Sequence, residues 1–60
     1  MEELTITELM KRTRTELCAL AARITTFLPD HPEGSPERTL AVRNLHNIRR
    51  VIAWYDLAPE

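Results

Sequence analysis

The side chains that could do chemistry in this sequence are few and widely spaced. The single cysteine, Cys18, and the two histidines, His31 and His46, stand far apart along the chain. A metal site needs several His, Cys or carboxylate ligands that converge, and no two of these residues have ligand spacing. His31 does lie beside Asp30 and Glu33, but that short cluster is typical of a solvated turn. We therefore expect no metal site and no bound cofactor.

Candidate nucleophiles are equally scarce. Cys18 lies outside the apolar pattern of its segment and has no neighbouring base to activate the thiol, so we interpret it as a small, half-buried filler. Ser35 is the only serine, and its position suits a helix cap. Gly34 is the only glycine, which excludes a glycine-rich phosphate loop. We expect no catalytic residues and no enzymatic activity.

The most informative charges lie between residues 38 and 55, where the chain has four arginines and no acidic residue. At helical steps of four, three and four, one face combines basic, amide and aromatic side chains: Arg43, Asn47, Arg50 and Trp54, with His46 adjacent. Arginine and tryptophan are enriched in protein–protein hot spots. The same side chains can also contact phosphates and stack on bases. The plain alternative is a solvated helix face whose arginines complement the helix dipole.

Length and composition limit the class of protein. The chain has 60 residues, 43% of them hydrophobic, and a net charge of −1, which excludes a disordered chain and a generally basic one. Its longest apolar run, residues 17–22, is too short to cross a bilayer. Glu2 and Glu3 stand where a signal peptide would be positive, and one cysteine allows no internal disulfide. We expect a complete, cytoplasmic small protein without membrane association.

The spacing of apolar residues predicts a first helix over residues 6–28. Thr5 and Glu8 have the spacing of a capping box, and Leu4 with Leu9 would form the accompanying hydrophobic staple. No glycine or proline interrupts this stretch. Side chains recur at alternating steps of four and three, with one polar member: Ile6, Met10, Thr13, Leu17, Leu20, Ile24 and Phe27.

A turn and a second helix follow. Pro29 ends the first helix, and residues 29–35 have turn composition. Ser35 then acts as N-cap for a helix over residues 36–56, and residues 57–60 form a frayed end. The second helix carries its own four–three pattern: Ala41, Leu45, Ile48, Ile52 and Tyr55. The fold class is therefore all-α, one domain of residues 1–60 built as an antiparallel two-helix hairpin.

The small size favours self-association. Below roughly 70–80 residues a single core rarely supplies more than about 3–5 kcal/mol, and two hairpins can pair as a four-helix bundle. A second four–three line on the second helix supports a homodimer: Leu40, Asn44, Asn47, Val51 and Trp54. Alternatively, the two asparagines face water. In length and architecture the chain resembles the Rop-type dimeric hairpin, with which it shares no sequence motif.

We interpret the sequence as a protein–protein interaction module, an adaptor or regulatory subunit that forms homo-oligomers. The partner-binding residues would be those of the mixed face: Arg43, His46, Asn47, Arg50 and Trp54. The alternative is a nucleic-acid-binding hairpin that uses the arginines of the same face. A net charge of −1 disfavours this alternative, because dedicated nucleic-acid binders of this size are usually basic.

Overall fold

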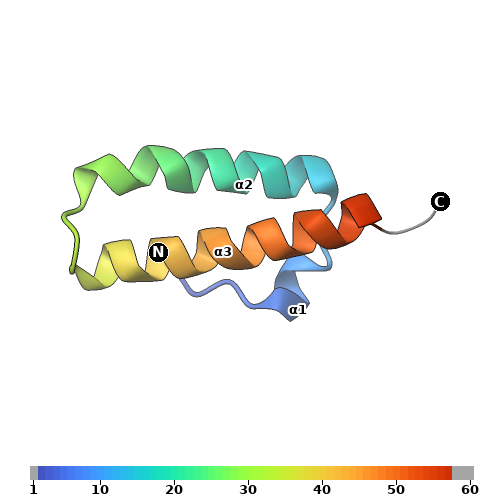
Figure 1. Ribbon diagram of the computed structural model, residues 1–60, viewed down its shortest axis with the longest axis horizontal. Coiled ribbons are helices and arrows are strands. Elements are labelled where there is room, and N and C mark those ends of the chain that lie inside the picture. Colours follow the sequence, from blue (N-terminus) through green and yellow to red (C-terminus); the bar gives the residue numbers. More distant parts are fainter. Residues whose placement is uncertain (1, 58–60) are drawn as a thin grey trace.

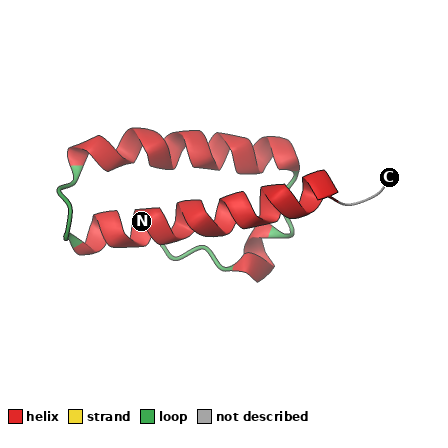
Figure 2. Ribbon diagram, viewed as in Figure 1, coloured by secondary structure: helices red, strands yellow, loops and turns green. Residues whose placement is uncertain are grey.

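Residues 2–57 are described by the computed structural model, and all their regular structure is helical. The elements are α1 (Ile6–Leu9), α2 (Arg14–Phe27), a 3₁₀ turn η1 (Leu28–Asp30) and α3 (Pro36–Leu57) (Figures 1 and 2). The all-α prediction is confirmed. Helix α3 continues through Leu57, one residue beyond the predicted end, so the fraying predicted for residues 57–60 is wrong at Leu57. Residues 58–60 lie outside the described residues.

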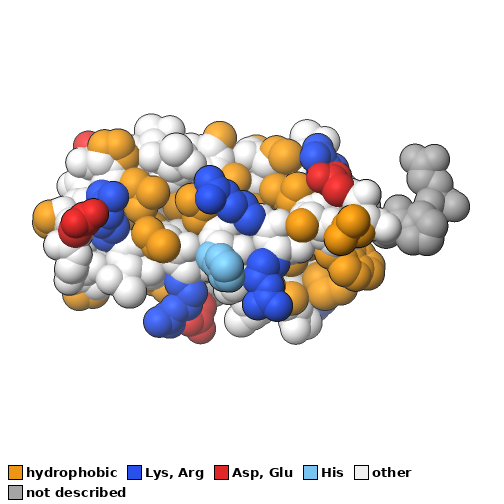
Figure 3. Space-filling view, viewed as in Figure 1, with side chains coloured by type: hydrophobic (Ala, Val, Ile, Leu, Met, Phe, Trp, Pro, Cys, Tyr) orange, Lys and Arg blue, Asp and Glu red, His pale blue; other side chains and the backbone are white. Residues whose placement is uncertain are grey.

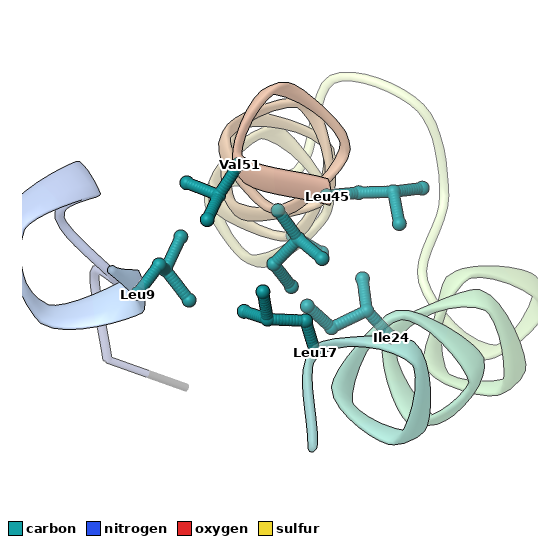
Figure 4. Close-up of a cluster of buried hydrophobic side chains, with 7 residues drawn as sticks. Leu9, Leu17, Ile24, Leu45 and Val51 are labelled. Carbon is teal, nitrogen blue, oxygen red and sulfur yellow. The ribbon is translucent and has the colours of Figure 1, made fainter. Parts of the chain in front are cut away.

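Helices α2 and α3 pack side by side as the predicted hairpin (Figure 1). Residues of both four–three patterns meet in one core, which Val51 and a leucine from α1 complete: Leu9, Leu17, Ile24, Ala41, Leu45, Ile48 and Val51. Figure 4 shows Leu9, Leu17 and Val51 pointing toward one another. Such burial stabilises a fold by about 25 cal/mol per Å² of apolar surface. The prediction of two long helices packed against each other is therefore confirmed.

The prediction of one continuous helix over residues 6–28 is wrong. The chain leaves the helical path after Leu9 and starts again at Arg14. Thr13 and Glu16 form a complete capping box: Thr13 Oγ1 accepts from the Glu16 backbone N–H at 3.1 Å, and Glu16 Oε1 accepts from the Thr13 N–H at 3.2 Å. This second start signal stabilises a new helix N-terminus and breaks the predicted helix.

The break folds the N-terminal part of the chain onto the other flank of α3. Thr5 caps α1 as predicted, because its Oγ1 accepts from the Glu8 N–H at 3.2 Å. Helix α1 then contributes Leu9 to the core from the side opposite α2 (Figure 4). At the break itself, the hydroxyl of Tyr55 donates to the Arg12 carbonyl oxygen at 2.7 Å. Helix α3 is consequently the central element, flanked by α2 and α1.

The connection between α2 and α3 is fixed by hydrogen bonds to backbone groups. Ser35 caps α3 as predicted, since its Oγ accepts from the Arg38 N–H at 3.2 Å. The Arg38 guanidinium donates to the carbonyl oxygens of Leu28 and His31, both at 3.0 Å. Gly34 has a φ of 86°, a left-handed conformation that glycine adopts without strain. The predicted turn is present, although η1 occupies its first two residues.

Candidate functional site

The outer face of α3 carries most of the residues predicted to bind a partner. Arg43, His46, Arg50 and Trp54 are all exposed there, together with Arg49. Figure 3 shows basic side chains over the middle of α3 and hydrophobic side chains gathered near its C-terminal end. No acidic residue interrupts α3 between Glu37 and Asp56, so positive charge dominates the middle of this face. The structure thus brings four of the five predicted residues onto one exposed surface.

Asn47, the fifth predicted residue, has a different environment. It is half-buried, and its Nδ2 donates to the Leu4 carbonyl oxygen at 3.1 Å. Asn44 is fully buried, with its Oδ1 accepting from the Leu4 N–H at 2.9 Å and its Nδ2 donating to the Glu2 carbonyl oxygen at 2.8 Å. These two asparagines bind residues 2–5 of their own chain, so the polar members of the line that suggested a homodimer have their partners within the molecule.

Arg43 forms an ion pair that the sequence pattern did not reveal. Its Nη1 lies 3.2 Å from Oε1 of Glu3, which the asparagines place beside α3. Both side chains are exposed, and exposed pairs contribute little to stability. The pair nevertheless neutralises one arginine of the predicted face. On this face, Arg49 and Arg50 form no ion pair with any residue in 2–57.

A small pocket opens between α1 and the C-terminal half of α3. It has a volume of about 210 Å³ and is lined by one arginine and four apolar residues: Ile6, Met10, Arg50, Val51 and Trp54. Trp54 is 56% exposed and Met10 46% exposed, although both are large and apolar. Leu57, one turn beyond Trp54, is 82% exposed. Sequence analysis predicted Arg50 and Trp54 here, whereas Met10 had been placed in the core.

A charged pair holds the end of α3 beside the start of α2. Arg14 donates two hydrogen bonds to the Asp56 carboxylate: Nε to Oδ1 at 2.8 Å, and Nη2 to Oδ2 at 3.2 Å. These hydrogen bonds lower the pKa of the Asp56 carboxyl and raise the pKa of the Arg14 guanidinium. Asp56 therefore stays ionised and already has a cationic partner near the pocket.

A second, longer groove lies on the opposite side, between residues 2–9 and α2. One part has a volume of about 430 Å³ and is mostly apolar: Glu2, Leu4, Leu20, Arg23, Ile24 and Phe27. The adjoining part, about 380 Å³, shares Leu4, Leu20 and Arg23 and extends past Ala19 toward Arg12. Sequence analysis missed this groove because a continuous first helix leaves no segment to form its second wall.

The remaining chemical candidates stay apart in the structure. Cys18 is exposed, so the prediction of a half-buried filler is wrong; it lies on α2 about 100° round the helix from the buried Leu17. Its Sγ lies 3.9 Å from Nη1 of Arg14. Within residues 2–57, no three His, Cys, Asp or Glu side chains could share a metal ion. Nor does that part of the chain contain a helix of the length and apolarity needed to cross a membrane.

Comparison with protein-family models, curated proteins and solved structures finds no match for this chain. Its function is therefore argued from the two surfaces just described. One is the apolar groove beside α2. The other is the pocket at Arg50 and Trp54, which we call the Arg50–Trp54 pocket.

Proposed function

We propose that this chain is a small helical protein–protein interaction module, an adaptor or regulatory subunit without enzymatic activity. One observation carries the proposal: Met10, Trp54 and Leu57 are large, apolar and exposed at the same end of the molecule. Exposed apolar side chains that cluster are a feature of binding surfaces, and tryptophan is among the residues most enriched in hot spots. Burial of these side chains against a partner would remove them from water.

Partner capture tests this proposal directly. The tagged full chain and its Trp54→Ala variant would be incubated with nuclease-treated host extract, and retained proteins compared by quantitative mass spectrometry. We expect specific proteins to be retained by the parent chain and lost from the variant. Trp54 is more than half exposed, so we expect the variant to fold. Circular dichroism would verify that it does. Identical retention by both chains would contradict a binding role for this end of the molecule.

We further propose that the module forms a homodimer through the groove beside α2. Leu4, Leu20 and Phe27 are only partly buried there, and a 60-residue chain gains much from additional apolar burial. Two copies facing each other across this groove would place both α2 helices at the interface, with each α3 outside. The dimer is then a helical bundle in which residues 2–5 replace part of a packed helix.

Sedimentation equilibrium tests the homodimer. The parent chain should sediment above 7.0 kDa at micromolar concentration. Ala19→Glu adds bulk and charge at an exposed position in the groove and should weaken self-association. Ala22→Glu is a matched control, since Ala22 is exposed on the same helix outside the groove. A folded 7.0 kDa species at all concentrations, or equal effects of both variants, would contradict the groove-mediated dimer.

Nucleic-acid binding is the second candidate, and one observation favours it. His46, Arg49 and Arg50 are exposed on a stretch of α3 that has no acidic residue. Contacts to several phosphates would weaken steeply as salt rises. Titration of a single-stranded oligonucleotide at two salt concentrations tests this candidate. The net charge of −1 and the Arg43–Glu3 pair both reduce the positive field that such binding needs.

A further inference from the structure

We propose that the Arg50–Trp54 pocket binds an acidic helical segment of a partner protein. The segment would insert one large apolar side chain into the pocket and place a carboxylate against the Arg50 guanidinium. This inference rests on the proposed function, and it names the chemistry of the partner. The argument uses the size of the pocket, its charge and the spacing of its walls.

The size of the pocket fits one side chain. Its volume of about 210 Å³ is below the roughly 300–1,000 Å³ typical of small-molecule sites. Ile6 and Val51 give it an apolar wall, and Met10 adds a flexible one that can adapt to different shapes. A single leucine, phenylalanine or similar anchor matches such a pocket better than a cofactor does. A nucleobase would stack on Trp54 but would leave its polar edges against the apolar wall.

The charge around the pocket calls for an anion. Two carboxylates near α3 already have cationic partners: Glu3 pairs with Arg43, and Asp56 pairs with Arg14. Arg50 has no ion pair with any residue in 2–57, and it lines the pocket. An arginine beside apolar groups binds a carboxylate strongly, because its planar fork can donate two hydrogen bonds and the apolar neighbours lower the local dielectric constant.

The spacing of the walls selects a helical partner. Arg50 and Trp54 are one helical turn apart on α3, which is about 5–6 Å along the helix axis. A partner helix that carries Asp or Glu three or four residues from a large apolar residue presents both groups at the same separation. This arrangement is the helix-in-groove mode of recognition, in which two side chains on one face of the partner helix make the main contacts.

Peptide selection against the full chain tests the inference. A displayed library of random tryptophan-free 15-residue peptides would be selected on the parent chain and, in parallel, on Arg50→Glu. We expect the parent to enrich Asp or Glu three or four positions from a large apolar residue. Arg50→Glu should enrich Lys or Arg at those positions instead. Both chains would first be compared by circular dichroism, and Arg50 is exposed, so the variant should fold.

Binding of the selected peptides would then be measured by the emission of Trp54, the only tryptophan in the chain. We expect affinity to fall at least tenfold in Arg50→Glu and less than threefold in Arg49→Glu. Arg49→Glu is the matched control, because Arg49 is the exposed neighbour with the same charge that does not line the pocket. Equal losses in the two variants would overturn the assignment of the carboxylate to Arg50.

The selection separates this inference from the proposed function. Enriched peptides without acidic preference, whose binding is lost in Trp54→Ala, would overturn the inference and leave the interaction module standing. A failure to enrich any peptide, together with no Trp54-dependent capture, would overturn both. Peptides that match this chain's own sequence would overturn the separate partner in favour of a second copy. Displacement of bound peptide by single-stranded oligodeoxythymidine at low salt would overturn it in favour of nucleic acid.

Discussion

The two flanks of α3 are held by different forces. Toward α2, the helix buries aliphatic side chains such as Leu45 and Ile48 against Leu17 and Ile24. Toward residues 2–5, it uses the amide groups of Asn44 and Asn47, which hydrogen-bond backbone atoms of that segment. Apolar packing accepts many partners of similar shape, whereas paired amides accept only a backbone in the right register. The first flank therefore supplies most of the stability, and the second fixes where the N-terminal segment lies.

The difference also decides which surfaces stay open. Residues 2–5 cover α3 along Asn44 and Asn47, but they are too narrow to close the gap to α2, where the long groove remains. Helix α1 covers Val51 yet leaves Met10 and Trp54 exposed at the Arg50–Trp54 pocket. Both proposed binding surfaces thus lie at the edges of the N-terminal segment. A continuous first helix would have had neither edge.

The largest effect is expected from breaking the apolar flank. Leu17 is fully buried, and Leu17→Ala removes its side-chain contacts and leaves a cavity. The free energy of unfolding should fall by about 3 kcal/mol, most of what a domain of this size possesses. Urea unfolding followed by circular dichroism measures the loss. Cys18→Ala, at the exposed neighbouring position, should change it by less than about 0.5 kcal/mol. Equal midpoints for the two variants would refute this account of the core.

The second effect tests the polar flank. Asn44→Ala leaves the Leu4 N–H and the Glu2 carbonyl without their side-chain partner, which should cost about 2 kcal/mol. Amide hydrogen exchange should accelerate at Leu4 more than at residues of α2, because the N-terminal segment can detach while α2 and α3 stay packed together. Unchanged protection at Leu4 would show that the asparagine does not hold this segment.

The third effect concerns the break that separates the two flanks. Thr13→Ala removes the hydroxyl that caps α2 and should lower the free energy of unfolding by about 1 kcal/mol. Residues 10–13 should nevertheless stay non-helical, because Tyr55 still donates to the Arg12 carbonyl. Carbon chemical shifts would report the backbone conformation, with Thr15→Ala as the exposed control in the same helical turn. Helical shifts across residues 10–13 would mean that the cap alone causes the break.

The smallest effect is a pH dependence at the end of the hairpin. The Arg14 hydrogen bonds hold the pKa of Asp56 below its ordinary 3.8 in the folded chain, so this stabilisation is present above pH 3.8 and is lost as the pH falls through the folded value. The thermal midpoint should therefore fall less steeply below pH 4 in Asp56→Asn than in the parent. Asp30→Asn, which removes a carboxyl outside this pair, should keep the parent's slope. If the thermal midpoint fell with the same slope in all three chains, the Arg14–Asp56 pair would not be a source of the pH dependence.

The apolar flank could be predicted from sequence because its signal is periodic. The four–three steps of Leu17, Ile24, Leu45 and Ile48 located both long helices and the face that each buries. The caps at Thr5 and Ser35 were read from residue type and spacing alone. Such signals are local, since each involves residues within one or two helical turns of one another.

The polar flank could not be predicted because its partners are backbone atoms far away in sequence. Asn44 and Asn47 matched a heptad line, which suggested a second copy, yet they bind Glu2 and Leu4 of the same chain. The break did have a local signal, the Thr13–Glu16 spacing. Sequence analysis did not use this signal, because Thr13 continues the four–three pattern and no glycine or proline interrupts the stretch. For the Arg50–Trp54 pocket, the sequence predicted the residues of the α3 wall. It did not predict the α1 wall, because the position of α1 depends on the break.

The long reach of these asparagines also sets an order of assembly. The hydrogen bonds from Asn44 and Asn47 to residues 2–5 span 40 to 43 positions, so almost the whole chain must close into a loop before they form. Loop closure of this length costs entropy that no local contact repays, and folding slows as contacts become more distant in sequence. During synthesis, residues 2–5 emerge long before their partners exist. Their hydrogen bonds to Asn44 and Asn47 can form only after that part of α3 has been made.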